Sequence, residues 1–102
     1  MRPLSYSRVA DVDSAVALVS GDPGGAFLAG GTTEIDLVRL GVERPDRLVD
    51  INALPLADVE ELASGGLRIG ALARMSDVAR TPVVAERYPA ISQALLLGAS
   101  EQ

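Results

Sequence analysis

The chain of 102 residues contains no cysteine and no histidine. Without cysteine it carries no disulfide bond, no thiolate metal site and no iron–sulfur cluster bound through its own residues. Without histidine it lacks the commonest general base and metal ligand, so its serine residues have no imidazole to activate them as nucleophiles. These absences leave no recognisable catalytic constellation and favour a binding module over an active site.

Aromatic residues and long apolar runs are also scarce. Only 3% of the residues are aromatic although 48% are hydrophobic, so the core must consist of Leu, Val, Ala and Ile. No run of 18 apolar residues is present, and the first residues do not resemble a signal peptide, so we expect neither a membrane span nor an export signal on this chain. The net charge of −5 argues against nucleic acid or an anionic membrane as a partner.

The most informative stretch runs over residues 26–40 and reads as a short buried strand, a glycine turn and the start of a helix. Gly30 and Gly31 allow a tight turn that leaves the neighbouring backbone N–H groups uncovered. Thr33 and Asp36 have the spacing of a helix N-terminus. Uncovered N–H groups at such a turn favour an anion, for which phosphate or pyrophosphate is the natural candidate.

The same pattern has a second interpretation, because paired glycines at a strand-to-helix turn also occur in α/β proteins that bind nothing there. The stretch is not the Rossmann G-x-G-x-x-G motif, since it has no third glycine, and it is not a P-loop, since it has no Gly-Lys-Ser/Thr. The residues alone therefore leave anion binding and a purely structural turn both open.

The periodicity along the chain predicts two parts with a boundary near residues 52–56. The first reads strand–helix–strand–helix–strand, which predicts a small parallel sheet with right-handed crossovers. The second reads as a hairpin over 59–63 and 67–71, two short helices and a last helix beginning at Pro89. The first helix should begin at Asp11 or Asp13. The positions expected to face the core are Val12, Ala15, Val16 and Val19 in the first helix, Ile35, Val38 and Val42 in the second, and Ile91, Ala94, Leu95 and Gly98 in the last.

Three runs, at residues 27–34, 44–52 and 65–74, together resemble one family. It is the FAD-binding medium subunit or domain of the molybdenum hydroxylases, which include xanthine dehydrogenase, carbon monoxide dehydrogenase and the bacterial aldehyde oxidoreductases. The run at 95–102 resembles most closely the aldehyde oxidoreductase branch. The resemblance covers essentially the whole chain, with the runs in the same order as in the family.

The resemblance implies an α+β fold, namely the FAD-binding fold of the vanillyl-alcohol oxidase-like type. An N-terminal βαβαβ lobe would occupy residues 1–54, and the incomplete beginning of a second, mainly antiparallel FAD-binding lobe would occupy 55–102. A second glycine loop, which completes the pyrophosphate site in the family, would follow Gln102.

The resemblance also implies the site. In the family the backbone amides of the first glycine loop bind the FAD pyrophosphate, and the matching positions here are Leu28, Ala29, Gly30, Gly31, Thr32, Thr33, Glu34 and Ile35. It assigns this chain no catalytic residue and no metal ligand. Two departures are Val38 with Arg39, where a Met-Lys pair is usual, and Met75, where histidine is frequent.

The function that the resemblance implies is electron transfer through FAD, from molybdenum and iron–sulfur centres to an external acceptor. The expected partners are a subunit with the molybdenum cofactor and a 2Fe–2S subunit. We expect the chain alone to be inactive and to self-associate, and the enzyme to be cytoplasmic, or periplasmic by co-export with a partner subunit. The alternative is a non-catalytic assembly or interaction module that no longer binds FAD.

Overall fold

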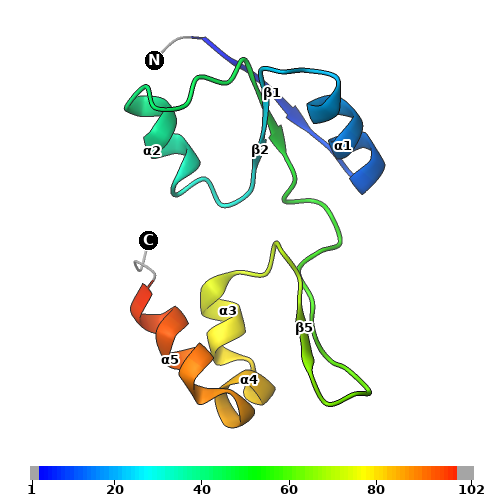
Figure 1. The fold of residues 1–102 in the computed structure, drawn as a ribbon, viewed down its shortest axis with the longest axis vertical. Coiled ribbons are helices and arrows are strands. Elements are labelled where there is room, and N and C mark those ends of the chain that lie inside the picture. Colours follow the sequence, from blue (N-terminus) through cyan, green and yellow to red (C-terminus); the bar gives the residue numbers. More distant parts are fainter. Residues whose placement is uncertain (1–2, 99–102) are drawn as a thin grey trace. The chain divides into compact units, whose positions relative to one another are not determined.

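The computed structural model describes residues 3–98, and the chain divides into two units, Met1–Pro55 and Leu56–Gln102 (Figure 1). Whether these units are two lobes of an FAD-binding domain stays a prediction. The end of the run at 95–102 and the segment expected after it lie outside the described residues.

Unit 1 alternates short strands and helices, as the sequence predicts. Its elements are β1 (Ser5–Arg8), α1 (Val12–Ser20), β2 (Gly25–Leu28), α2 (Glu34–Arg39) and β3 (Arg47–Asp50). The three strands form one parallel sheet in the order β1-β3-β2, which confirms the predicted parallel arrangement.

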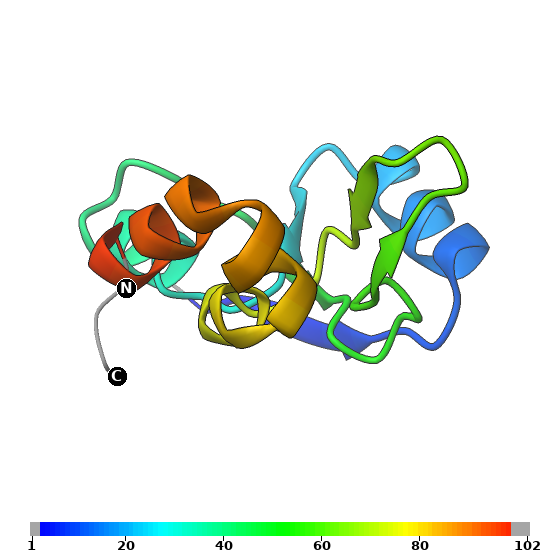
Figure 2. The same ribbon diagram turned by 90° about the horizontal axis from the view of Figure 1, so that it is seen from below.

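The order of the strands fixes where the two helices lie. The connection from β1 to β2 crosses β3 in one direction, and the connection from β2 to β3 returns in the other. Because parallel connections are right-handed, opposite directions place their helices on opposite faces of the sheet. Figures 1 and 2 show α1 and α2 on opposite sides of the strands. Val49, in the central strand between the two helices, is completely buried.

The register aligns the carboxyl ends of all three strands. Asp50, the last residue of β3, pairs with Arg8 of β1 and with Leu28 of β2. The loops that leave β1, β2 and β3 therefore emerge at one edge of the sheet, the edge at which open parallel sheets bind their ligands.

Helix α1 begins as predicted but buries less than its sequence suggests. The Asp11 side chain accepts a hydrogen bond from Ser14 N at 2.7 Å, so Asp11 caps the helix and Asp13 does not. In the predicted apolar stripe only Ala15 is buried, whereas Val12 and Val16 are exposed. Helix α1 packs mainly on β2 and β3, and two strands of four residues are too narrow to cover the stripe.

The second helix also buries fewer of its apolar residues than the sequence predicts. Of the three positions expected to face the core, only Val38 is buried; Ile35 is exposed, and Val42 lies beyond the end of α2 with 69% of its surface exposed. Thr33 occupies the N-cap, but its side chain makes no capping hydrogen bond. The Thr-x-x-Asp spacing therefore located the start of the helix correctly without forming the expected cap.

Unit 2 consists of a hairpin followed by three helices. Strands β4 (Val59–Glu61) and β5 (Leu67–Ile69) pair in antiparallel fashion, as predicted, and the turn between them contains a glycine with a φ of +95°, Gly65. The helices are α3 (Met75–Arg80), α4 (Pro82–Arg87), with proline in its first turn, and α5 (Pro89–Gly98). No helix within residues 3–98 is long and apolar enough to cross a membrane.

Most of the buried face predicted for α5 was wrong. Of the four expected positions only Leu95 is half-buried, whereas Ile91, Ala94 and Gly98 are exposed, and Ser92 is buried instead. Its hydroxyl donates to the carbonyl oxygen of Ala79 in α3 at 2.7 Å, which satisfies the buried polar group. Because Ser92 is small and finds its acceptor in the facing helix, α5 can approach α3 closely. Hydrophobic periodicity does not reveal such a contact.

Candidate functional site

The glycine loop, residues 28–35, leaves the carboxyl end of β2 and leads into α2. Gly31 has a φ of +79°, a conformation that L side chains rarely adopt. A Cβ atom at this position would lie 3.3 Å from Leu28 Cδ1 and 3.4 Å from Ile35 Cγ1. The loop therefore requires glycine here for both its backbone conformation and its packing.

Five consecutive backbone N–H groups of this loop, from Gly30 to Glu34, are uncommitted. Within the part of the chain that the structure describes, none of the N–H groups from Gly30 to Glu34 donates a hydrogen bond to another residue. The next amide, that of Ile35, donates to Gly31 O at 3.0 Å. The sequence-predicted residues thus form one continuous loop with a series of available donors. Their roles in binding a ligand stay predictions.

Residues at the end of β3 hold the beginning of the loop. Ile51 N donates to Leu28 O at 3.0 Å, and the side-chain amide of Asn52 donates to Ala29 O at 2.7 Å. Asp50 in turn accepts hydrogen bonds from Asn52, through its backbone N at 2.9 Å and its Nδ2 at 2.8 Å. Asp and Asn two positions apart are typical of a side-chain-stabilised turn, so the sequence carries a signal for this contact that hydrophobic periodicity does not use.

Asp50 is a buried carboxylate with several donors around it. The Tyr6 hydroxyl donates to Asp50 Oδ2, and the two Asn52 nitrogens donate to Oδ1. These hydrogen bonds, that of Tyr6 first, lower the pKa of Asp50 from its usual value, and the bond to Asp50 raises the pKa of Tyr6. Asp50 therefore stays ionised at neutral pH and acts as a fixed acceptor at the edge of the sheet where the strands end.

Glu34 introduces an acidic group into the glycine loop. It is half-buried, and its Oε1 atom is buried without a hydrogen-bond partner among the described residues. Burial raises the pKa of Glu34, and the neighbouring carboxyl of Glu43 raises it further. In its ionised form Glu34 would oppose an anion bound to the adjacent amides.

The substitution Glu34→Gln is expected to stabilise the chain at neutral pH. Because the folded state raises the pKa of Glu34, the protonated carboxyl favours the folded state more than the ionised one does. This stabilisation is complete below the unfolded-state pKa of Glu34 and is lost as the pH rises through its folded-state pKa. Glutamine does not titrate, so the variant should exceed the wild type in unfolding free energy at neutral pH and lose this advantage on acidification. Urea unfolding from neutral pH down to below the unfolded-state pKa of Glu34 measures the difference in unfolding free energy between the two chains.

Glu86→Gln, on the exposed face of α4, removes the same charge and serves as the control. An advantage of Glu34→Gln that does not vary with pH, or that Glu86→Gln reproduces, would contradict this account of Glu34.

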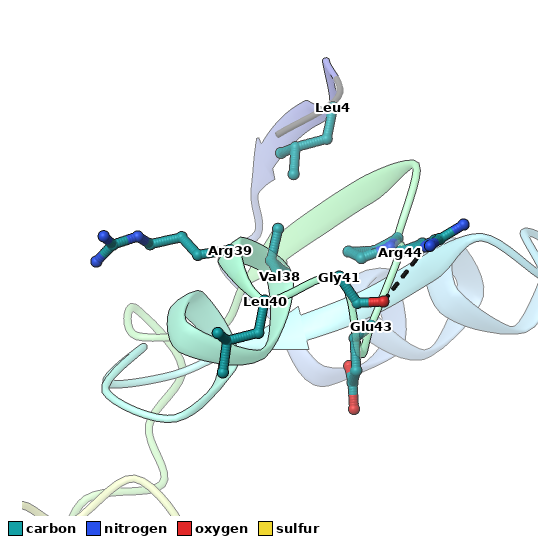
Figure 3. A pocket seen from close by; sticks show the side chains of 8 residues that line it. Leu4, Val38, Arg39, Leu40, Gly41, Glu43 and Arg44 are labelled. Atoms are coloured by element: carbon teal, nitrogen blue, oxygen red, sulfur yellow. Dashed lines mark hydrogen bonds between the residues drawn. The ribbon is translucent and has the colours of Figure 1, made fainter.

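Two hollows of unit 1 lie away from the glycine loop. One, of about 300 Å³, is lined mainly by residues 38–45 together with Leu4 (Figure 3). The other, of about 290 Å³, is lined by residues 23–26 and 43–45. In Figure 3 the side chains of Arg39 and Arg44 extend in opposite directions, so they do not converge on a common anion. No group of acidic residues in the described segment could hold a metal ion.

Comparisons with known proteins place the chain in a family. The model of the FAD binding domain in molybdopterin dehydrogenase matches residues 2–102. The chain is 43% identical over 102 residues to the aldehyde oxidoreductase FAD-binding subunit PaoB of Escherichia coli (strain K12), a match that covers 100% of this chain and 32% of that protein. It is 31% identical over 90 residues to the glyceraldehyde dehydrogenase medium chain of Sulfolobus acidocaldarius, with 88% and 32% covered.

The fold has a counterpart among solved structures. A carbon monoxide dehydrogenase from Hydrogenophaga pseudoflava that lacks the Mo-pyranopterin moiety of its cofactor contains a chain that superposes with a TM-score of 0.91 and 32% identity. The match covers 100% of this chain and 37% of that one. The chain thus spans about a third of the length of the curated relatives that it matches.

Proposed function

This chain belongs to the family of FAD-binding domains in molybdopterin dehydrogenases, and from that premise we propose that its glycine loop binds the pyrophosphate of FAD. The observation that supports this most strongly is the run of uncommitted backbone N–H groups from Gly30 to Glu34. Phosphate oxygens accept hydrogen bonds and carry negative charge, so they match backbone donors at a turn where no side chain intervenes.

The residues present fit this cofactor. Gly31 has no side chain to cover the amides, and its positive φ lets successive N–H groups lie in a turn that regular strand or helix would not form. When bound, FAD supplies the redox chemistry. The contribution of this chain is to bind and orient the phosphates through Gly30, Gly31 and Thr32, and to keep the loop in the required conformation from β3.

We propose further that the chain is part of the FAD-binding subunit of a molybdenum-containing oxidoreductase that delivers electrons to an external acceptor. The molybdenum cofactor and the 2Fe–2S clusters would reside on partner subunits, which the name of the E. coli relative, an FAD-binding subunit, supports. The two units would be the beginning of an FAD-binding fold of the vanillyl-alcohol oxidase-like type. The close structural similarity to carbon monoxide dehydrogenase supports this.

The alternative function is that of an assembly module that no longer binds FAD. One observation favours it, namely the carboxyl group of Glu34 within the proposed phosphate-binding loop. The raised pKa of Glu34 reduces the conflict without removing it.

The 102-residue chain alone is expected to bind FAD weakly, with a dissociation constant near 1 mM (about −4 kcal/mol). A hydrogen bond to a charged group contributes about 1.5–3 kcal/mol. Association itself costs at least about 4 kcal/mol, which consumes most of the gain from a few such bonds. Titration with FAD, followed by flavin fluorescence, measures the affinity.

Light scattering on the same samples measures self-association, which we expect because, among residues 3–98, β4 and β5 pair only with each other and each leaves one unpaired edge. Submicromolar binding of FAD by a chain that stays monomeric would contradict the expectation that this chain carries only part of the FAD site. The absence of any flavin response at several millimolar FAD would favour the assembly module.

A further inference from the structure

Three side chains form a hydrogen-bonded group that we call the Asp50/Asn52 clamp. They are Tyr6 of β1, and Asp50 and Asn52 at and just beyond the end of β3. Asp50 is only 9% exposed, and a buried carboxylate is tolerated only where donors surround it. Both of its oxygens are engaged, Oδ2 by Tyr6 from β1 and Oδ1 by the backbone and side chain of Asn52. The carboxylate is thus fixed in position between two strands of the sheet.

Asn52 connects this fixed carboxylate to the glycine loop. Its Nδ2 atom donates one hydrogen bond to Asp50 Oδ1 at 2.8 Å and a second to Ala29 O at 2.7 Å. Both partners are acceptors, so only the NH₂ end of the amide can occupy this place. Asp50 therefore determines the orientation of the Asn52 amide, and the amide determines the position of the Ala29 carbonyl group.

The position of the Ala29 carbonyl group has a direct consequence for the next donor. The peptide unit between Ala29 and Gly30 is planar and trans, so the N–H of Gly30 points opposite to the Ala29 C=O. With the carbonyl oxygen held toward Asn52, the N–H of Gly30 is directed away from β3. It is the first of the uncommitted donors of the loop.

We propose that Asn52 is a positioning residue, oriented by Asp50, that directs the Gly30 N–H toward the phosphate of the bound cofactor. This inference rests on the proposed function of the loop as a phosphate site. Asn52 itself does not contact the ligand; it acts by fixing one peptide plane, while Ile51 N fixes the preceding carbonyl, that of Leu28. Without the side-chain amide, the Ala29–Gly30 peptide would rotate freely, and the donor would be directed toward the phosphate only part of the time.

The test uses the ¹⁵N-labelled 102-residue chain titrated with ADP, which carries a pyrophosphate, and with AMP, which does not. Asn52→Ala removes both side-chain donors. It is expected to weaken ADP binding about tenfold and to shift and broaden the Gly30 amide signal in the free chain. Asn52→Gln keeps an amide that is one methylene too long to bridge the two acceptors, and it should act in the same way if Asn52→Ala does not fold.

Ser5→Ala is the matched control, because the Ser5 hydroxyl also donates from a side chain to a backbone carbonyl, that of Asp46, at the opposite end of the same sheet. It should change the unfolding free energy without changing ADP affinity or the Gly30 signal. A purely structural role for Asn52 would make both positions behave alike. ADP binding by Asn52→Ala and Asn52→Gln within twofold of the wild type, with an unchanged Gly30 amide, would overturn the proposal.

The failure of the proposed function would look different. If ADP causes no shift in the wild type, the loop is not a phosphate site, and the ¹⁵N relaxation of the Gly30 amide, which reports the mobility of its peptide group, decides whether Asn52 fixes the loop. Greater mobility of the Gly30 amide in Asn52→Ala, but not in Ser5→Ala, would then support the fixed peptide, whereas equal mobility in all three chains would overturn it.

Discussion

Replacing Gly31 with valine is expected to eliminate binding of FAD by the glycine loop while leaving unit 2 folded. The native φ of +79° is strained for any L residue and most strained for a β-branched one, at a cost of about 1–3 kcal/mol. The new Cβ would also press on Leu28 and Ile35 at 3.3 and 3.4 Å. The loop would relieve this strain by turning the peptide planes on both sides of residue 31, which disperses the donors that a phosphate requires.

Gly41→Val is the matched control for this prediction. Gly41 also has a positive φ, +74°, but it lies after the other end of α2, and among the described residues the only atom within 4 Å of an added Cβ would be Arg44 Nη2 at 3.9 Å. The two variants should lose comparable amounts of unfolding free energy in urea, whereas only Gly31→Val should lose the FAD-dependent shifts of the loop amides. Retention of those shifts in Gly31→Val would show that the phosphates bind elsewhere.

Replacing Gly70 with alanine is expected to unfold unit 2. Gly70 follows β5, and an added Cβ would lie 2.0 Å from the carbonyl oxygen of Leu56 and 2.5 Å from its carbonyl carbon. These backbone atoms cannot withdraw easily, because Leu56 O already accepts from Leu72 N at 2.9 Å and Gly70 N donates to Asp58 O at 2.8 Å. Relief of the clash would break both bonds, so we expect a loss above about 4 kcal/mol, which a small unit cannot absorb.

Gly66→Ala, in the turn of the same hairpin, provides the comparison. Its added Cβ would have Leu62 Cδ1 as its nearest neighbour at 3.8 Å, an ordinary contact, so the change should stay within about 0.5 kcal/mol. Thermal unfolding followed by circular dichroism, with amide spectra to separate the units, measures both variants. Equal midpoints for Gly70→Ala and Gly66→Ala would contradict the close packing of Gly70 against Leu56.

The parts of the fold that depend on local chemistry could be predicted from the sequence. The capping of α1 by Asp11 and the hairpin around Gly65 follow from residue types with strong conformational preferences. The exposed valines of α1 and the buried Ser92 could not be predicted, because they depend on how narrow the sheet is and on how closely α5 approaches α3. Periodicity indicates which residues are apolar, but not how large a surface is available to bury them.

The candidate site could also be predicted only in part. Gly30 and Gly31 indicated the turn, and the resemblance of three separate runs to one family indicated FAD as its ligand, which the glycines alone do not. That Asn52 holds Ala29 O, 23 residues away in sequence, could be seen only once the register of β2 and β3 was known. The unpaired oxygen of Glu34 was likewise invisible, because it results from burial in the folded chain.

A titration of the ¹⁵N-labelled chain with FAD at neutral pH, followed residue by residue through its amide signals, decides whether the glycine loop binds the FAD pyrophosphate. We expect saturable shifts that are largest for the amides from Gly30 to Glu34, with a dissociation constant near 1 mM. Largest shifts at residues 38–45, around the hollow beside Arg39 and Arg44, or no shift at any concentration of FAD, would contradict it.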